Sequence, residues 1–76
     1  MIEKTIKLSR IEDVKKFVEA SLMRDFDIDL ISGKYVVDGK SIMGIFSLDL
    51  TSPIVMRANC ENDAEFMEIV SKYTID

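Results

Sequence analysis

The sequence contains no histidine and only one cysteine among its 76 residues. Without histidine, the chain lacks the side chain that most often serves as general base, metal ligand or phosphoryl-accepting nitrogen. The single cysteine, Cys60, excludes an internal disulfide and a cysteine-clustered metal site. With no histidine to activate its thiol, Cys60 is a poor nucleophile, and we expect a small, partly buried residue at this position.

Long apolar runs and an excess of positive charge are also missing. No run approaches the roughly 20 apolar residues of a membrane-spanning helix. The opening MIEKTIKL alternates charged and apolar residues and lacks the apolar core of a signal peptide. The formal net charge of −4 disfavours non-specific binding to nucleic acid or anionic lipid. We therefore expect a cytoplasmic protein without nucleic-acid or membrane partners.

Motifs for catalysis are missing as well. The sequence has no glycine-rich phosphate loop and no nucleotide-binding fingerprint. Asp25, Asp27 and Asp29 alternate along a strand pattern, so their carboxylates stand in a row about 6.6 Å apart instead of converging on a metal. No pair of carboxylates is placed in a shared apolar cleft. We predict that the protein is not an enzyme and carries no metal or cofactor.

The sequence does contain enough apolar residues to form one small hydrophobic core. Hydrophobic residues make up 47% of the chain, which favours a globular domain over disorder. We expect residues 1–76 to form a single domain. A domain of this size hides only about 60% of the surface that its unfolded chain exposes, so stability is expected to be marginal and a homodimer is an open alternative.

Hydrophobic periodicity and capping signals predict an α+β domain in the order strand, helix, strand, strand, short helix, strand, helix. Ser9, with Glu12 three residues later, predicts a capping box for the first helix, and Asn62 with Glu65 predicts the start of the last one. The helices are expected to cover one face of an antiparallel sheet. The predicted strands cover 2–8, 25–31, 34–38 and 54–59, the first helix covers 10–22 with Ile11, Val14, Phe17, Val18 and Leu22 buried, and the last helix buries Phe66, Ile69, Val70 and Tyr73.

The segment GKSIMGIFSLDL, residues 39–50, concentrates apolar residues directly behind a serine. Ser41 is the predicted N-cap of the short helix. In one interpretation Ser41 is only a helix cap. In the other it is also a phosphorylation switch, because a phosphate on an N-cap serine is compatible with the helix and Lys40 could offset its charge. A short helix that is apolar nearly all round must be deeply buried or meet a partner. The partner-binding residues predicted here are Lys40, Ile42, Met43, Ile45 and Phe46.

VDGKSIMGIFSLDL, residues 37–50, resembles the regulatory-serine region of HPr, the phosphocarrier protein of the bacterial sugar phosphotransferase system. The resemblance extends backward through DIDLISGKYVVD, and ENDAEFMEIV and KKFVEAS are similar to parts of the family's last and first helices. It implies an open-faced sandwich, with a four-stranded sheet in the order first, fourth, second, third and three helices on one side. It also implies that Ser41 is phosphorylated by an HPr-type serine kinase, and that the phosphorylated form binds a transcriptional repressor of carbon catabolite control.

The second signature of the HPr family is missing. Members of the family carry histidine, arginine and proline at the start of the first helix, and the histidine passes a phosphoryl group to sugar permeases. Here Arg10, Glu12 and Asp13 stand in about those places. The chain is similar in this respect to Crh, a relative that lacks the carrier histidine and keeps the serine. A degenerate carrier site is therefore expected.

Three hypotheses follow from these patterns. The leading one is a histidine-less HPr-like regulatory protein that is controlled through Ser41 and its apolar neighbours. The rival is an interaction module without a switch, in which Ser41 is only a cap and Phe46 lies in a permanent interface, most simply that of a homodimer. The third, a decoy competing with HPr for its enzymes, is less attractive because Glu12 and Asp13 alter the surface that those enzymes contact.

Overall fold

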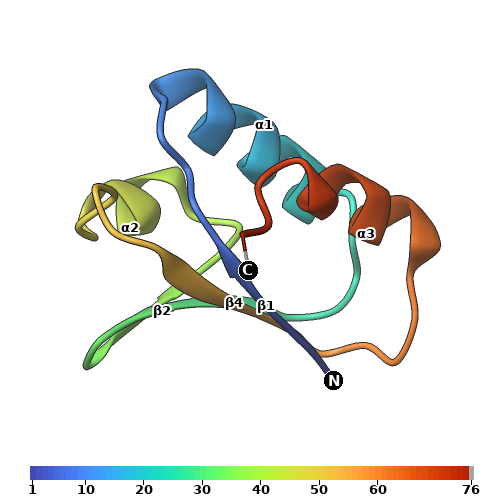
Figure 1. The fold of residues 1–76 in the computed structure, drawn as a ribbon. Coiled ribbons are helices and arrows are strands. Elements are labelled where there is room, and N and C mark those ends of the chain that lie inside the picture. Colours follow the sequence, from blue (N-terminus) through green and yellow to red (C-terminus); the bar gives the residue numbers. More distant parts are fainter. Residues whose placement is uncertain (76) are drawn as a thin grey trace.

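The computed structural model describes residues 1–75, and its four strands form one antiparallel sheet in the order β1–β4–β2–β3. The helices lie on one face of the sheet and leave the other face open (Figure 1). This arrangement confirms the predicted α+β fold class and the predicted strand order. The strands are β1 (Ile2–Ile6), β2 (Ile28–Ser32), β3 (Tyr35–Asp38) and β4 (Ile54–Ala58), and the helices are α1 (Ile11–Leu22), α2 (Ile42–Phe46) and α3 (Ala64–Ser71).

The β2–β3 hairpin turns through two residues, Gly33 and Lys34, because Ser32 pairs with Tyr35. The prediction placed this turn one residue earlier. Gly33 has a φ of 59°, the only positive φ among the described residues, and glycine adopts this backbone conformation without steric cost. The sequence therefore places glycine at the one turn position that requires it.

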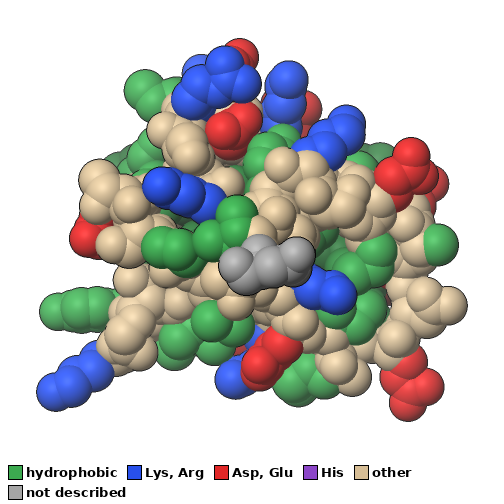
Figure 2. Space-filling model, in the orientation of Figure 1, with side chains coloured by type: hydrophobic (Ala, Val, Ile, Leu, Met, Phe, Trp, Pro, Cys, Tyr) green, Lys and Arg blue, Asp and Glu red, His purple; other side chains and the backbone are tan. Residues whose placement is uncertain are grey.

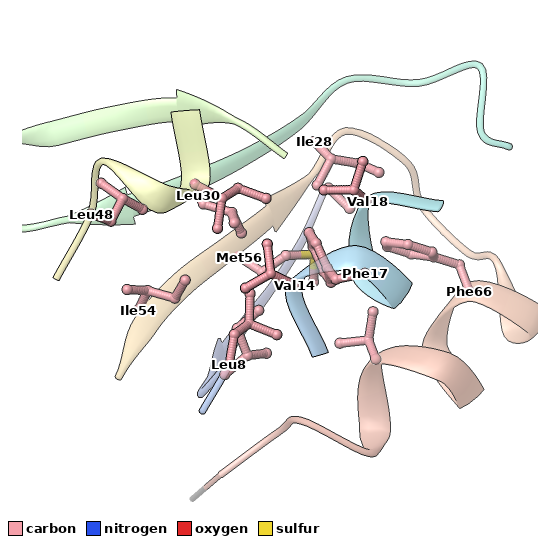
Figure 3. Packing of buried hydrophobic residues seen from close by; sticks show 14 residues of the cluster. Leu8, Val14, Phe17, Val18, Ile28, Leu30, Leu48, Ile54, Met56 and Phe66 are labelled. Atoms are coloured by element: carbon pink, nitrogen blue, oxygen red, sulfur yellow. The ribbon is translucent and has the colours of Figure 1, made fainter. Parts of the chain in front are cut away.

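The core lies between the sheet and the helices (Figure 3). Alternate residues of the strands point into it, and α1 and α3 contribute aromatic rings. The Phe17 and Phe66 rings lie 6.3 Å apart, and the Phe26 ring meets the Phe66 ring edge-on at 5.8 Å. These rings join the two long helices to the segment that leads into β2. The fully buried apolar residues include Ile6, Leu8, Val14, Phe17, Ile28, Leu30, Ile45, Met56, Phe66 and Val70.

The N-cap of each long helix lies one residue later than predicted. Arg10, not Ser9, is the N-cap of α1, and its backbone N–H donates to the Asp13 carboxylate at 3.2 Å. Asp63, not Asn62, is the N-cap of α3, and its carboxylate accepts the Phe66 N–H at 3.0 Å. Serine and asparagine are common caps, but here the Asp13 carboxylate accepts the Arg10 amide in α1 and the Asp63 carboxylate accepts the Phe66 amide in α3.

The strands are shorter than predicted, and two apolar residues of α1 are exposed. β2 begins at Ile28, so Asp25 and Asp27 precede the strand. Ile11 and Leu22, the end residues of α1, are 64% and 61% exposed. Their spacing agrees with the buried stripe, but only the middle of the helix packs on the sheet. Amphipathic periodicity identifies the inner face of a helix and does not show how far along the helix that face is covered.

Candidate functional site

Ser41 lies at the N-terminus of α2 in the position predicted for it. Its backbone is extended, with φ −107° and ψ 108°, and its hydroxyl oxygen accepts the Gly44 N–H at 3.1 Å. Its own N–H donates to the Asp38 carbonyl at 3.0 Å, which holds the cap against the end of β3. The side chain is partly exposed. Ser41 therefore caps the helix at a partly exposed position.

Gly44 allows α2 to lie this close to the sheet. A Cβ atom on Gly44 would sit 3.3 Å from the Val37 Cβ and 3.2 Å from the Ser41 hydroxyl oxygen. Both distances are tighter than ordinary van der Waals contact. The glycine in the SIMG string thus has a packing role, and it brings the Ser41 hydroxyl within hydrogen-bonding distance of a backbone amide.

Lys40 is not a free cation beside Ser41. Its ammonium donates to the Arg24 carbonyl at 2.9 Å, and its backbone N–H donates to the Asp38 carboxylate at 2.9 Å. These contacts tie the start of α2 to the loop that follows α1. The Arg24 side chain in turn pairs with Asp63 at 3.0 Å and with Glu65 at 2.6 Å. Lys40, the residue predicted to offset charge at Ser41, thus also connects the start of α2 to the loop after α1.

The apolar residues of α2 divide between the core and the surface. Ile45 is fully buried, so its prediction as a partner-binding residue is corrected: in this fold its side chain belongs to the core. Ile42 is partly buried and packs against the core. Met43 is 78% exposed and Phe46 42% exposed. We call Ser41, Met43 and Phe46 the α2 surface.

A carboxylate follows the α2 surface in the chain. The Asp49 side chain accepts hydrogen bonds from both the hydroxyl and the backbone N–H of Thr51. The hydroxyl first, and the amide second, lower the pKa of Asp49 below its ordinary value because both stabilise the ionised form. A negative charge is therefore held in the turn after α2, where Ser47 also closes the helix through its hydroxyl.

The three residues predicted as a degenerate carrier site come together at the start of α1. The Arg10 guanidinium lies 3.0 Å from the Glu12 carboxylate and 3.9 Å from that of Asp13. Over α1, at the top of Figure 2, blue basic side chains stand beside red acidic ones. The only cation of the trio is thus engaged by its two acidic neighbours, and none of the three supplies a nucleophilic nitrogen.

An open hollow of about 460 Å³ adjoins this trio. Tyr73 lines it with Arg10 and Asp13. Burial, followed by the nearby Asp13 charge, raises the pKa of Tyr73 above its ordinary value, because both disfavour the phenolate. The phenol is therefore neutral at physiological pH and offers no base. The remaining lining residues are Lys7, Ser9, Lys16, Lys72, Thr74 and Ile75.

The comparisons with known proteins address the fold. The sequence matches no protein-family model and no curated protein. The structure is similar to that of HPr-C-His from Thermoanaerobacter tengcongensis, with a TM-score of 0.78 and 23% identity over 95% of this chain and 89% of that one. It is also similar to the phosphocarrier protein HPr from Bacillus anthracis, with a TM-score of 0.71 and 24% identity over 97% and 96% of the two chains.

The chain has the HPr fold. The predicted site residues occupy two places in it: the trio Arg10, Glu12 and Asp13 at the start of α1, and the α2 surface with Lys40 and Ile42 beside it. In the HPr fold of this chain, no group of three or more potential ligand side chains among residues 1–75 could hold a metal ion. None of its described helices is long and apolar enough to cross a membrane.

The role of Arg24 was not predicted from the sequence. Its carbonyl anchors Lys40, and its side chain joins the start of α3. The HPr fold brings this residue next to segments 16 and 39 positions away in the sequence. No local pattern predicts a contact between a loop carbonyl and a distant ammonium, so the signal was not present in the sequence alone.

Proposed function

We propose that this chain is a histidine-less, HPr-like regulatory protein of the phosphotransferase-system family, controlled by phosphorylation of Ser41. The observation that carries the proposal is the α2 surface, where the partly exposed cap residue Ser41 precedes exposed Met43 and Phe46. The role is that of a cytoplasmic, non-enzymatic interaction protein. Its proposed partners, an HPr-type serine kinase and a catabolite repressor, come from the sequence resemblance.

The cap geometry is compatible with a phosphate. The Ser41 oxygen already accepts the Gly44 N–H, and a phosphate there would add acceptor oxygens and about two negative charges near pH 7. The backbone N–H groups of the first turn favour such an acceptor. The Lys40 ammonium lies in the same segment, held by a single carbonyl. Phosphorylation is therefore expected to preserve α2.

Phosphorylation of Ser41 would also change the charge of the surface that a partner contacts. Before it, the α2 surface presents apolar side chains and a hydroxyl; after it, a dianion stands beside Met43 and Phe46. A partner with an arginine for the phosphate and an apolar pocket for Phe46 would distinguish the two forms, because charge-assisted hydrogen bonds to phosphate are strong and directional. Phosphate-dependent binding thus follows from one added group.

A carrier role does not fit the start of α1. A carrier must hold phosphate on a ring nitrogen, and the chain contains no histidine. Arg10 is paired with Glu12 and lies near Asp13, so two carboxylates occupy the region where an incoming phosphate would need positive charge. The proposed function therefore excludes phosphoryl transfer.

Incubation with an HPr-type serine kinase and ATP tests the proposal. We expect one phosphate by intact-mass spectrometry, and peptide mapping should place it on Ser41. Ser41→Ala should take up none. Ser47→Ala is the matched control, because Ser47 is an exposed serine at the other end of α2, and it should be modified like the wild type. An unchanged mass, or a phosphate on Ser47, would overturn the proposal.

Binding to the repressor separates the switch from the rival module. Calorimetry should detect binding only for the phosphorylated protein, and Phe46→Ala should weaken it at least tenfold. A partner or homodimer that buries Phe46 with the same affinity before and after phosphorylation would instead support the interaction module without a switch. Ile45→Ala is not a suitable variant here, because Ile45 is in the core.

A further inference from the structure

The outer edge of β3 is uncovered. β3 lies at the end of the sheet and pairs with β2 on one side, and no other described strand pairs with its outer side. Only its last residue is engaged there, because the Asp38 carbonyl accepts the Ser41 N–H. The opposite edge of the sheet, β1, is partly covered by the chain itself. The C-terminal segment runs beside it, where Ile6 bridges to Thr74 and the Ile75 N–H donates to the Thr5 carbonyl at 2.9 Å. An open strand edge is a template for pairing with another strand.

The hairpin geometry determines which backbone groups of β3 face outward. Ser32 and Tyr35 close the two-residue turn, and hydrogen-bonded pairs alternate along an antiparallel ladder. Tyr35 and Val37 therefore direct their N–H and C=O groups toward β2. Val36 directs its N–H and C=O outward, between the turn residue Lys34 and Asp38, whose carbonyl already accepts the Ser41 N–H. The Val36 side chain is 61% exposed.

The charges at this edge are unbalanced. The strand register places Glu3, Arg57, Asp29 and Asp38 in one row across the open face of the sheet. Arg57 contacts Glu3 at 2.8 Å, whereas Asp29 and Asp38 stand directly opposite each other. Like charges opposite one another destabilise a strand pair. The outermost carboxylate, that of Asp38, accepts the Lys40 backbone N–H and would gain further from a cation supplied on its outer side.

We propose that β3 is a homodimer interface, in which it pairs antiparallel with β3 of a second copy about a two-fold axis at Val36. Val36 then faces its own equivalent and exchanges backbone hydrogen bonds with it. Lys34 of each copy stands opposite Asp38 of the other, so the partner supplies the missing cation on both sides of the axis. Registers centred on Lys34 or on Asp38 would oppose like charges, so the charge pattern selects this one.

Apolar contacts support the same register. Thr5, Val55, Ile31 and Val36 form the neighbouring row of the open face. In the dimer this row continues through the two-fold axis into its equivalent, which makes one apolar strip across both sheets. On the helix side, Tyr35, which is 73% exposed, would lie opposite partly buried Val37 of the second copy. Cross-strand pairs of an aromatic and a β-branched residue stabilise sheets.

The interface is short, because β3 has four residues. A contact of this size falls at the weak end of protein–protein interfaces, so we expect a reversible dimer with a dissociation constant between about 10 μM and 1 mM. The inference does not rest on the proposed function. It uses the edge of the sheet and involves neither the Ser41 side chain nor Phe46.

Sedimentation equilibrium with charge-exchanged variants tests the dimer. Lys34→Asp should weaken self-association at least tenfold, because Asp at 34 then faces Asp38 of the other copy. Asp38→Lys should do the same by opposing two lysines. An equimolar mixture of the two variants should associate at the wild-type level, since every pair in the mixed dimer is again opposite in charge. Recovery in the mixture cannot come from a variant that merely fails to fold.

Two further variants complete the test. Val36→Pro removes the outward N–H at the edge, where proline is tolerated, and should abolish association while the circular dichroism spectrum stays unchanged. If Asp38→Lys does not fold, Val36→Pro and Lys34→Asp still test the proposal. Phe46→Ala should leave the dimer intact. A wild-type protein that stays monomeric at about 1 mM, association unaffected by Lys34→Asp, or a mixture that does not recover would each overturn the proposal.

Discussion

At the scale of single residues, Gly39 shows how tightly the segment before α2 is packed. A Cβ atom here would lie 2.7 Å from the Ile28 Cγ2 and 3.1 Å from the Ile28 carbonyl oxygen. The Gly39 N–H donates to that same carbonyl at 2.7 Å. The glycine is therefore required by the close approach of two backbone segments, with φ in the ordinary range.

Gly39→Ala is expected to lower the free energy of unfolding by about 1–3 kcal/mol, because overpacking forces the backbone or Ile28 to move. Urea denaturation monitored by circular dichroism measures the change. In an Ile28→Ala background, which removes the closest methyl group, the additional cost of Gly39→Ala should be smaller. Equal costs in both backgrounds would show that the Ile28 side chain is not the obstacle.

The same scale shows what local patterns can and cannot predict about the site. The role of Ser41 as a cap was predicted from its place before an apolar run, and the structure confirms it. Met43 and Ile45 were both predicted as partner-binding residues, whereas Met43 is exposed and Ile45 is buried. Only contact with the sheet distinguishes them.

At the scale of elements, the Asp63 carboxylate makes two different contacts at the start of α3. One oxygen of Asp63 caps the helix at the Phe66 N–H, and the other accepts from the Arg24 guanidinium. Glu65 also contacts Arg24, but its side chain is 78% exposed. The Arg24 guanidinium lies over the Phe66 ring, 5.8 Å from its centre, so the loop after α1 and the first turn of α3 form one unit.

Asp63→Ala is expected to destabilise the protein by at least the value of an N-cap, about 1 kcal/mol. Glu65→Ala should leave stability close to that of the wild type, because exposed ion pairs contribute little. Thermal unfolding of the two variants in the same buffer gives the comparison. The order of the two effects is the decisive result, and a larger loss for Glu65→Ala would contradict this account of α3.

Elements were predicted better than their ends. The kind and order of all described helices and strands agree with the sequence patterns, since alternation and helical spacing extend over many residues. The caps of α1 and α3 were wrong by one residue. The end of a helix depends on one or two residues, so neighbouring positions such as Ser9 and Arg10, or Asn62 and Asp63, are not separated by a pattern that extends over many residues.

At the scale of the whole molecule, the sheet order gives the strands unequal protection. β4 lies between β1 and β2, and its Ile54, Met56 and Ala58 are buried beneath the helices. β3 has one neighbour and one open edge. Regions with few buried contacts and a solvent-exposed edge open most easily.

Native-state hydrogen exchange of the monomer should therefore find the slowest amides in β4 and faster exchange in β3, above all at Val36, whose N–H faces outward. NMR at low protein concentration measures this directly. β3 amides as slow as those of β4 under these conditions would show that the edge is protected within a single chain, against the topology described here.

The sequence by itself determined the α+β class, the order of the elements and the Ser41 cap, because each depends on residues within one segment. The resemblance to HPr also predicted the sheet order. Only the tertiary structure decided that Ile45 belongs to the core, that Lys40 is held by the Arg24 carbonyl and that β3 keeps an open edge. These features depend on which segments meet across the sheet, and long-range packing chooses among the apolar and charged residues that local patterns treat alike.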